Sequence, residues 1–215
     1  DTFWKGPESG APVFLCVGGE GPAFDPSVTV DSVHCSNAVD WLEETGALFL
    51  AVQHRYYGCS KNATVDCPVN NFDQPTEALK FLNSKQALGD LARFHQYATD
   101  TYKLDIAKNK WISWGGSYPG MLASWVRLKF PHLIHASVAS SAPVHTKLAM
   151  PEYNDHVAFA FGLADVGGSD QCVAAITSGH AEIGAMMKTD DGRKKLKVLF
   201  PSLPSADWLK TRANQ

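Results

Sequence analysis

The feature of this sequence that most constrains its fold is the alternation of short apolar runs with helical patterns. Four runs have the composition of strands buried in a sheet: residues 13–17, 47–52, 111–114 and 136–140. Three intervening stretches have apolar residues at helical spacing: 37–45, 87–102 and 118–129. Ser36 and Ser84 are the cap candidates of the first two helices, and Gly46 ends the first. Because parallel neighbours need such long crossovers, the order predicts an α/β fold with a doubly wound parallel sheet.

The pattern changes after Pro143. Residues 170–187 place apolar side chains on one helical face, residues 192–199 predict a shorter helix, and no fifth strand is evident. We therefore expect residues 1–145 to be the N-terminal part of the sheet domain. Residues 146–215 are expected to begin a helical segment that is inserted in that domain or appended to it.

Composition excludes several classes of protein. The chain has 19 Lys and Arg against 22 Asp and Glu, a net charge of −3, which argues against a basic nucleic-acid binder. With 45% hydrophobic and 19% charged residues, it can bury a core and is not expected to be disordered. No apolar run approaches the roughly 18 to 20 residues that span a bilayer, and residues 1–7 do not resemble a signal peptide.

The five cysteines match no zinc spacing, so neither a metal site nor a cofactor is expected. Cys59 and Cys67 bracket a polar stretch that contains a glycosylation acceptor at Asn62. This arrangement predicts a Cys59–Cys67 disulfide and an oxidising compartment on the secretory route. Cys16 lies within an apolar run and is expected to be a buried free thiol, while Cys172 has no obvious partner nearby.

The stretch from 111 to 122 contains a strand, a glycine-rich turn and a helix, which is typical of a nucleophile elbow carrying Ser117. The Gly-x-Ser-x-Gly pattern fails at one position, where Pro119 replaces the last glycine. Proline is tolerated in the first turn of a helix, and Tyr118 keeps the backbone N–H that an oxyanion needs. The alternatives are an ordinary glycine-rich turn or a phosphate loop, although no phosphate-binding pattern is present.

A second oxyanion donor is expected from the Gly-Gly-Glu-Gly loop at 18–21, where Gly19 and Glu20 follow the first strand. The alternative is a plain glycine turn. We interpret the Glu20 carboxylate as solvated, although it could instead accept a hydrogen bond from a substrate ammonium. His54, after the second strand, is interpreted as structural rather than as the catalytic base.

A serine hydrolase of this fold also needs an acid and then a histidine after the serine in the chain. His132 and His135 occupy surface or capping positions, and no suitable acid lies between Ser117 and His145. Two pairs satisfy the chain order alone, and both lie in the helical segment: Asp155 with His156 and Asp170 with His180. The 215 residues therefore predict a nucleophile without a recognisable acid and base.

Several separate motifs occur in an order that resembles the S28 serine peptidases: 18–21, His-Arg-Tyr-Tyr-Gly at 54–58, Gln-Ala-Leu-Gly-Asp at 86–90, Gly-Gly-Ser-Tyr-Pro-Gly at 115–120, 127–132 and 139–144. Lysosomal Pro-X carboxypeptidase, dipeptidyl peptidase II and thymus-specific serine protease belong to this family, and the last branch is the most similar. Two positions depart from the family pattern. Gln53 replaces a glutamate, which puts a local charge contact in doubt, and Cys59 replaces a loop residue.

The resemblance implies an α/β-hydrolase domain interrupted by a helical insertion. It implies a lysosomal or secreted serine exopeptidase that cleaves peptides near proline through an acyl-enzyme, with Ser117 as nucleophile. The family's acid and histidine follow the insertion, so this chain is expected to be an incomplete portion that is inactive alone. The sequence leaves open carboxypeptidase or dipeptidyl peptidase activity and a homodimer. The alternative function is a catalytically silent binding module.

Overall fold

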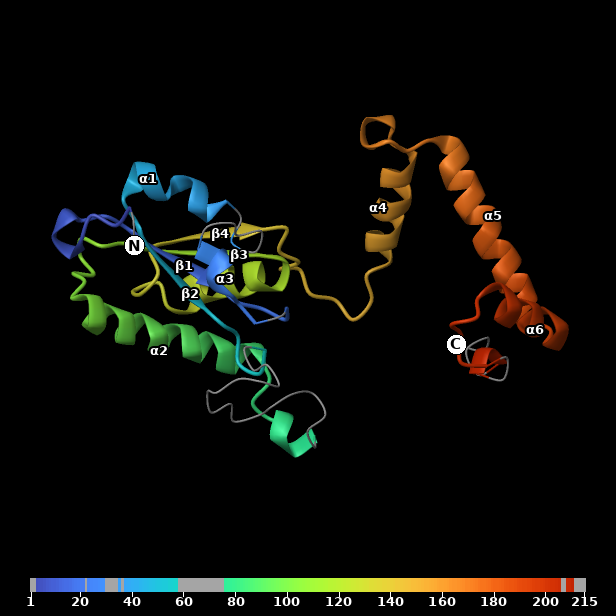
Figure 1. Ribbon diagram of the computed structural model, residues 1–215, viewed down its shortest axis with the longest axis horizontal. Helices are drawn as coiled ribbons and strands as arrows, with labels where there is room; N and C mark the ends of the chain where they lie inside the picture. The colour runs from blue at the N-terminus through green and yellow to red at the C-terminus, as the bar shows by residue number, and fades with distance from the viewer. Residues whose placement is uncertain are drawn as a thin grey trace. The chain divides into compact units, whose positions relative to one another are not determined.

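The chain forms two compact units, Asp1–Thr146 and Lys147–Gln215, which are considered separately (Figure 1). The computed structural model describes residues 3–21, 23–29, 35, 37–57, 76–205 and 208–210. Among the helices in these ranges, none is long and apolar enough to cross a membrane.

The first unit is built on a parallel sheet of four strands: β1 Val13–Val17, β2 Leu48–Val52, β3 Trp111–Gly116 and β4 Ala136–Ser140. The strand order is β2-β1-β3-β4, and every neighbouring pair is parallel, which confirms the predicted α/β class. The chain runs outward from β1 to β2, then returns to β3 on the other side of β1. The direction of winding therefore reverses between β1 and β3, and α/β proteins bind ligands at the carboxyl ends of such strands.

Helices cover both faces of this sheet, so β1 is buried along its whole length. On one face, α2 (Ser84–Tyr102) and α3 (Ser117–Lys129) pack against alternate β1 residues such as Leu15. On the other face, a 3₁₀ turn η3 (Ala38–Trp41) and the short helix α1 (Leu42–Thr45) pack against Phe14 and its neighbours. Figure 1 shows α1 and α2 on opposite sides of the strands. Burial on both faces explains why the strand sequences are continuously apolar.

The helix ends differ in detail from the prediction. The helix expected at 37–45 is divided into η3 and α1, and it ends, as expected, at Gly46 with a φ of 63°. Helix α2 is capped by Asn83, whose side chain accepts the Gln86 N–H at 2.9 Å, so the prediction of Ser84 as cap is wrong by one residue. The other predicted cap, Ser36, lies outside the described residues.

The second unit contains the helices α4 Pro151–Gly162, α5 Asp170–Met187 and α6 Asp190–Leu199, and residues 208–210 are also helical. Helices α5 and α6 occur where the sequence predicts them. Helix α4 was not predicted, because its apolar side chains do not follow a single buried face. Elsewhere in the described part of the chain, short 3₁₀ turns occur at η1 Pro7–Ser9, η2 Pro26–Thr29, η4 Thr76–Leu79 and η5 Ala164–Val166.

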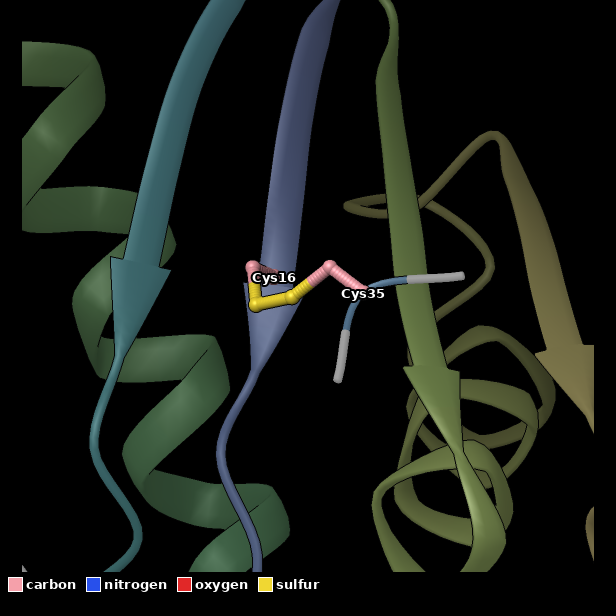
Figure 2. The surroundings of a disulfide bond; sticks show 2 residues. All are labelled: Cys16 and Cys35. Atoms are coloured by element: carbon pink, nitrogen blue, oxygen red, sulfur yellow. A yellow bond between two sulfur atoms is a disulfide. The ribbon is translucent and has the colours of Figure 1, made fainter. Parts of the chain in front are cut away.

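A disulfide joins Cys16, the fourth of the five residues of β1, to Cys35 (Figure 2). The Cα atoms are 5.4 Å apart and both residues are fully buried, so the expectation of a free thiol at Cys16 is wrong. The sequence did not indicate this pairing, because a cysteine in a strand buried on both faces has apolar neighbours whether it is a free thiol or part of a disulfide. Among the described cysteines Cys172 is free. Cys59, Cys67 and the acceptor Asn62 lie outside the described residues.

Candidate active site

Ser117 lies at the sharp turn from β3 into α3, as the elbow prediction requires. It is the first residue of α3, directly after the last strand residue Gly116, and its φ is 57°. A left-handed conformation is unfavourable for serine and persists only where the surrounding structure holds it. Such strain at a strand-to-helix turn is typical of the nucleophile elbow, which exposes the serine hydroxyl above the sheet.

Glycines let the first turn of α3 pack directly on the strands. A Cβ on Gly115 would collide with the backbone of Pro119 and would lie 2.8 Å from the Gly120 nitrogen. A Cβ on Gly120 would lie 3.1 Å from the Ser140 carbonyl oxygen at the end of β4. Close approach of the backbone therefore excludes a side chain at Gly115 and leaves little room for one at Gly120, which explains the small residues around the elbow.

The glycine loop after β1 lies against the same elbow. The Gly18 N–H donates to the Val52 carbonyl at 2.8 Å, and a Cβ on Gly19 would collide with the Pro119 ring. The loop and the elbow enclose a pocket of about 250 Å³. Its lining residues are Val17, Gly19, Glu20, Gly21, Phe24, Gln53, Gly116, Ser117 and Pro119. The structure thus brings the predicted Gly19, Glu20 and Ser117 together at one pocket.

Tyr118 is not among the residues that line this pocket, but it offers a backbone donor next to Ser117 in the chain. It is the second residue of α3, and the first four N–H groups of an α-helix have no acceptor within the helix. The helix dipole also favours negative charge at this end. The Tyr118 amide is therefore able to stabilise an oxyanion that forms beside Ser117.

The Tyr118 side chain forms a hydrogen bond with His54, which lies in the segment that follows β2. The Tyr118 hydroxyl and His54 Nε2 are 3.0 Å apart, and His54 Nδ1 is 2.8 Å from the Arg55 carbonyl oxygen. Burial lowers the pKa of His54 and raises the pKa of Tyr118. Because both ring nitrogens of His54 are engaged, this geometry supports a structural histidine rather than a free base.

An ion pair anchors the segment that carries His54. Arg55 donates to both carboxylate oxygens of Asp90 on α2, at 2.7 and 2.6 Å, and to the Phe81 carbonyl at 3.1 Å. The hydrogen bond to Asp90 raises the pKa of Arg55. Sequence reasoning noted both motifs separately and missed this pairing, although their opposite charges were a usable signal.

Gln53 lies at the pocket wall and ties two loops together. Its side-chain oxygen accepts the Phe24 backbone N–H at 2.5 Å. The position at which the family pattern has glutamate therefore makes a neutral hydrogen bond here. That bond holds the segment after β1 against the segment after β2.

The described residues of the pocket wall include no histidine that could serve as the base for Ser117, and Glu20 is the one acid among them. His132, His135 and His145 belong to the first unit and are exposed. The other candidates belong to the second unit: Asp155 and His156 on α4, Asp170 and His180 on α5. In the part of the chain that the structure describes, no group of three or more His, Cys, Asp or Glu residues could hold a metal ion.

A parallel α/β sheet, a strained serine at a strand-to-helix turn and a glycine loop beside it define an α/β-hydrolase. The chain matches the family Serine carboxypeptidase S28 over residues 2–213, and it belongs to that family. It is 37% identical over 189 residues to Thymus-specific serine protease of Homo sapiens, covering 88% of this chain and 34% of that protein. The chain spans about a third of the length of this relative.

Two further comparisons have lower coverage or similarity. The chain is 36% identical over 148 residues to Lysosomal Pro-X carboxypeptidase of Bos taurus, covering 67% of this chain and 26% of that protein. The structure overlaps a thioesterase domain from the curacin biosynthetic pathway with a TM-score of 0.42 and 14% sequence identity, covering 98% of this chain and 58% of the other.

Proposed function

We propose that this chain supplies the nucleophile and the oxyanion donors of a serine exopeptidase. The Ser117 hydroxyl attacks the carbonyl carbon of the scissile peptide bond while a histidine base takes its proton. The base returns this proton to the leaving amine, and water then hydrolyses the acyl-enzyme. The Tyr118 N–H and an N–H of the loop at Gly19 and Glu20 stabilise the oxyanion. The acid and the histidine base come from residues outside these 215. The observation that carries this proposal is the left-handed backbone of Ser117 beside a pocket that the glycine loop also lines.

The proposed substrate is a peptide that is cut near proline. This specificity is supported by the motifs shared with the S28 peptidases and by a relative named as a Pro-X carboxypeptidase. The proposed location is the lysosome or the extracellular space. The Cys16–Cys35 disulfide supports an oxidising compartment, and relatives are named for the lysosome.

A fluorophosphonate probe tests the proposal, because it reacts with an activated serine. In the full-length protein, the probe is expected to label Ser117, and label is expected to disappear in Ser117→Ala. Ser124→Ala is the matched control, since that hydroxyl bonds the Met121 carbonyl within the same helix. Label that persists in Ser117→Ala would refute the nucleophile. An unlabelled wild-type protein would favour a catalytically silent binding module.

A further inference from the structure

The donor and the acceptor of the hydrogen bond between Tyr118 and His54 follow from the contacts of the His54 ring. His54 Nδ1 lies 2.8 Å from the Arg55 carbonyl oxygen, which can only accept, so Nδ1 carries the proton. In the neutral ring Nε2 is then an acceptor, and the Tyr118 hydroxyl donates to it at 3.0 Å. Tyr118 is thus held by a specific acceptor and not by ring packing alone.

This hydrogen bond joins segments that are not neighbours in the sheet. His54 follows β2, Tyr118 follows β3, and β1 lies between these strands. The loop after β1 packs against the segment that carries His54. A Cβ added to Gly18 would lie only 2.8 Å from the backbone nitrogen of His54. Segments from the carboxyl ends of β1, β2 and β3 therefore meet around the Tyr118–His54 bond.

The acceptor itself is held rigidly. His54 is 6% exposed, and its ring lies 5.3 Å from the Tyr57 ring and 5.5 Å from the Tyr118 ring. The backbone next to it is anchored by the bidentate pair of Arg55 and Asp90. Burial lowers the pKa of His54, which favours the neutral ring, in which Nε2 accepts.

The Tyr118 amide sits directly after a strained residue. A left-handed serine keeps its backbone angles only where its surroundings hold them, and Tyr118 is the next side chain along the elbow. We propose that His54 is a positioning residue of the oxyanion site, which fixes the Tyr118 amide by holding the Tyr118 hydroxyl. This inference rests on the proposed function of the site. His54 does not line the pocket at Ser117, and it acts through Tyr118.

Four variants of the full-length protein separate this role from packing. Tyr118→Phe removes the hydroxyl and keeps the ring and the amide. His54→Asn places its amide near the Nδ1 position, out of reach of Tyr118, whereas His54→Gln places an acceptor near the Nε2 position. The fourth variant combines Tyr118→Phe with His54→Asn. Tyr97→Phe is the matched control, because Tyr97 is 63% exposed on α2.

Displacement of an oxyanion donor is expected to lower kcat rather than to raise KM. Tyr118→Phe and His54→Asn should each lower kcat by about tenfold to a hundredfold with KM nearly unchanged. The double variant should lose no more than the worse single variant, since both remove the same bond. His54→Gln should recover most of the activity lost in His54→Asn, and Tyr97→Phe should match the wild type.

Each outcome has a clear meaning. A wild-type protein that neither cleaves peptides nor reacts with a fluorophosphonate contradicts the proposed function itself. If the wild type is active through Ser117, wild-type kcat in Tyr118→Phe overturns the role of His54. Effects of the two single variants that multiply in the double variant also overturn it. Should His54→Asn fail to fold, Tyr118→Phe and His54→Gln still decide the question by kcat and KM.

Discussion

At the scale of single residues, the elbow depends on positions where no side chain fits. Gly115 lies in β3 directly beneath the first turn of α3, and a Cβ there would meet the backbone of Pro119 and Gly120. Backbone cannot move aside as the end of a long side chain can. The left-handed Ser117 therefore depends on the absence of a methyl group two residues earlier in the chain.

Gly115→Ala is expected to destabilise the protein by about 1 to 3 kcal/mol, the usual cost of overpacking, and to lower the rate of fluorophosphonate labelling. Gly89→Ala is the matched control, because Gly89 is in α2 and its Cβ would meet open space. That change should stabilise by about 0.5 to 1 kcal/mol, since alanine favours the helix interior. Denaturant unfolding of both variants measures the difference; equal stability would contradict the steric argument.

Two buried histidines make stability depend on pH. Burial lowers the pKa of His54 and of His95 from the ordinary value of 6.5. His95 is 3% exposed, and its ring centroid is 4.4 Å from that of Trp111. Below pH 6.5 these two histidines bind more protons in the unfolded chain than in the folded protein. The free energy of unfolding should therefore fall as the pH decreases below 6.5.

Denaturant unfolding of the full-length protein at about pH 7.5 and about pH 5 measures this loss. His95→Phe keeps an aromatic ring against Trp111 and should lose part of the pH dependence. His180→Gln is the control, because His180 is exposed on α5, and it should keep the wild-type dependence. An unchanged dependence in His95→Phe would contradict a role for His95.

The sequence predicted Ser117 and its glycine neighbours because the elbow is a local pattern within a few residues. It did not predict the partners of Tyr118 or Arg55. Those contacts join the segments after β2 and β3, and the segment after β2 to α2. Such pairs become visible only when the strand order is known. For the same reason the partner of Cys16 was missed.

At the scale of elements, the strands and helices that bury a continuous or periodic set of apolar residues were predicted most accurately. Strand β1 and helix α5 have the predicted bounds, because their composition or periodicity is strong. Strand β3 continues two residues beyond the prediction, to Gly116, since glycines carry no apolar signal yet pair with Ala139 and Ser140 of β4. Helix α4 has no buried residue within its own unit, so the periodic signal on which the prediction depends is absent.

The Cys16–Cys35 disulfide should stabilise the first unit. It closes a segment with a sequence separation of 19, which in the chain-entropy estimate corresponds to about 3 kcal/mol. Denaturant unfolding should show that the Cys16→Ala, Cys35→Ala double variant has a free energy of unfolding lower by about that amount. Added reductant should have little further effect on this variant. Cys172→Ser should behave as the wild type, because that cysteine is free. Wild-type stability in the double variant would contradict the bond.

At the scale of the whole molecule, residues 1–215 produced alone are expected not to turn over peptides. A serine without a base loses several orders of magnitude in rate, and the described pocket wall contains no histidine. The measurement compares the purified fragment with the full-length protein on peptides containing proline. Turnover by the fragment that depends on Ser117 and approaches the full-length rate would show that the base is His145, His156 or His180.

The same fragment is expected to self-associate. Its second unit carries large apolar side chains that are at least 37% exposed: Tyr153, Val157, Phe159, Phe161, Leu163 and Val166. Exposed apolar surface of this kind promotes association in isolated pieces. Size-exclusion chromatography of the fragment at increasing concentration measures this tendency, and a concentration-independent monomer would contradict it.

The contact of Pro119 with Gly19 links two positions that are far apart in the chain. The proline ring fills the space that a side chain at position 19 would need. In a homologue with glycine at position 119, that space is vacant and a larger residue fits at position 19. The two positions are therefore expected to covary during evolution, and a proline could enter the elbow only in lineages whose first loop already carried glycine.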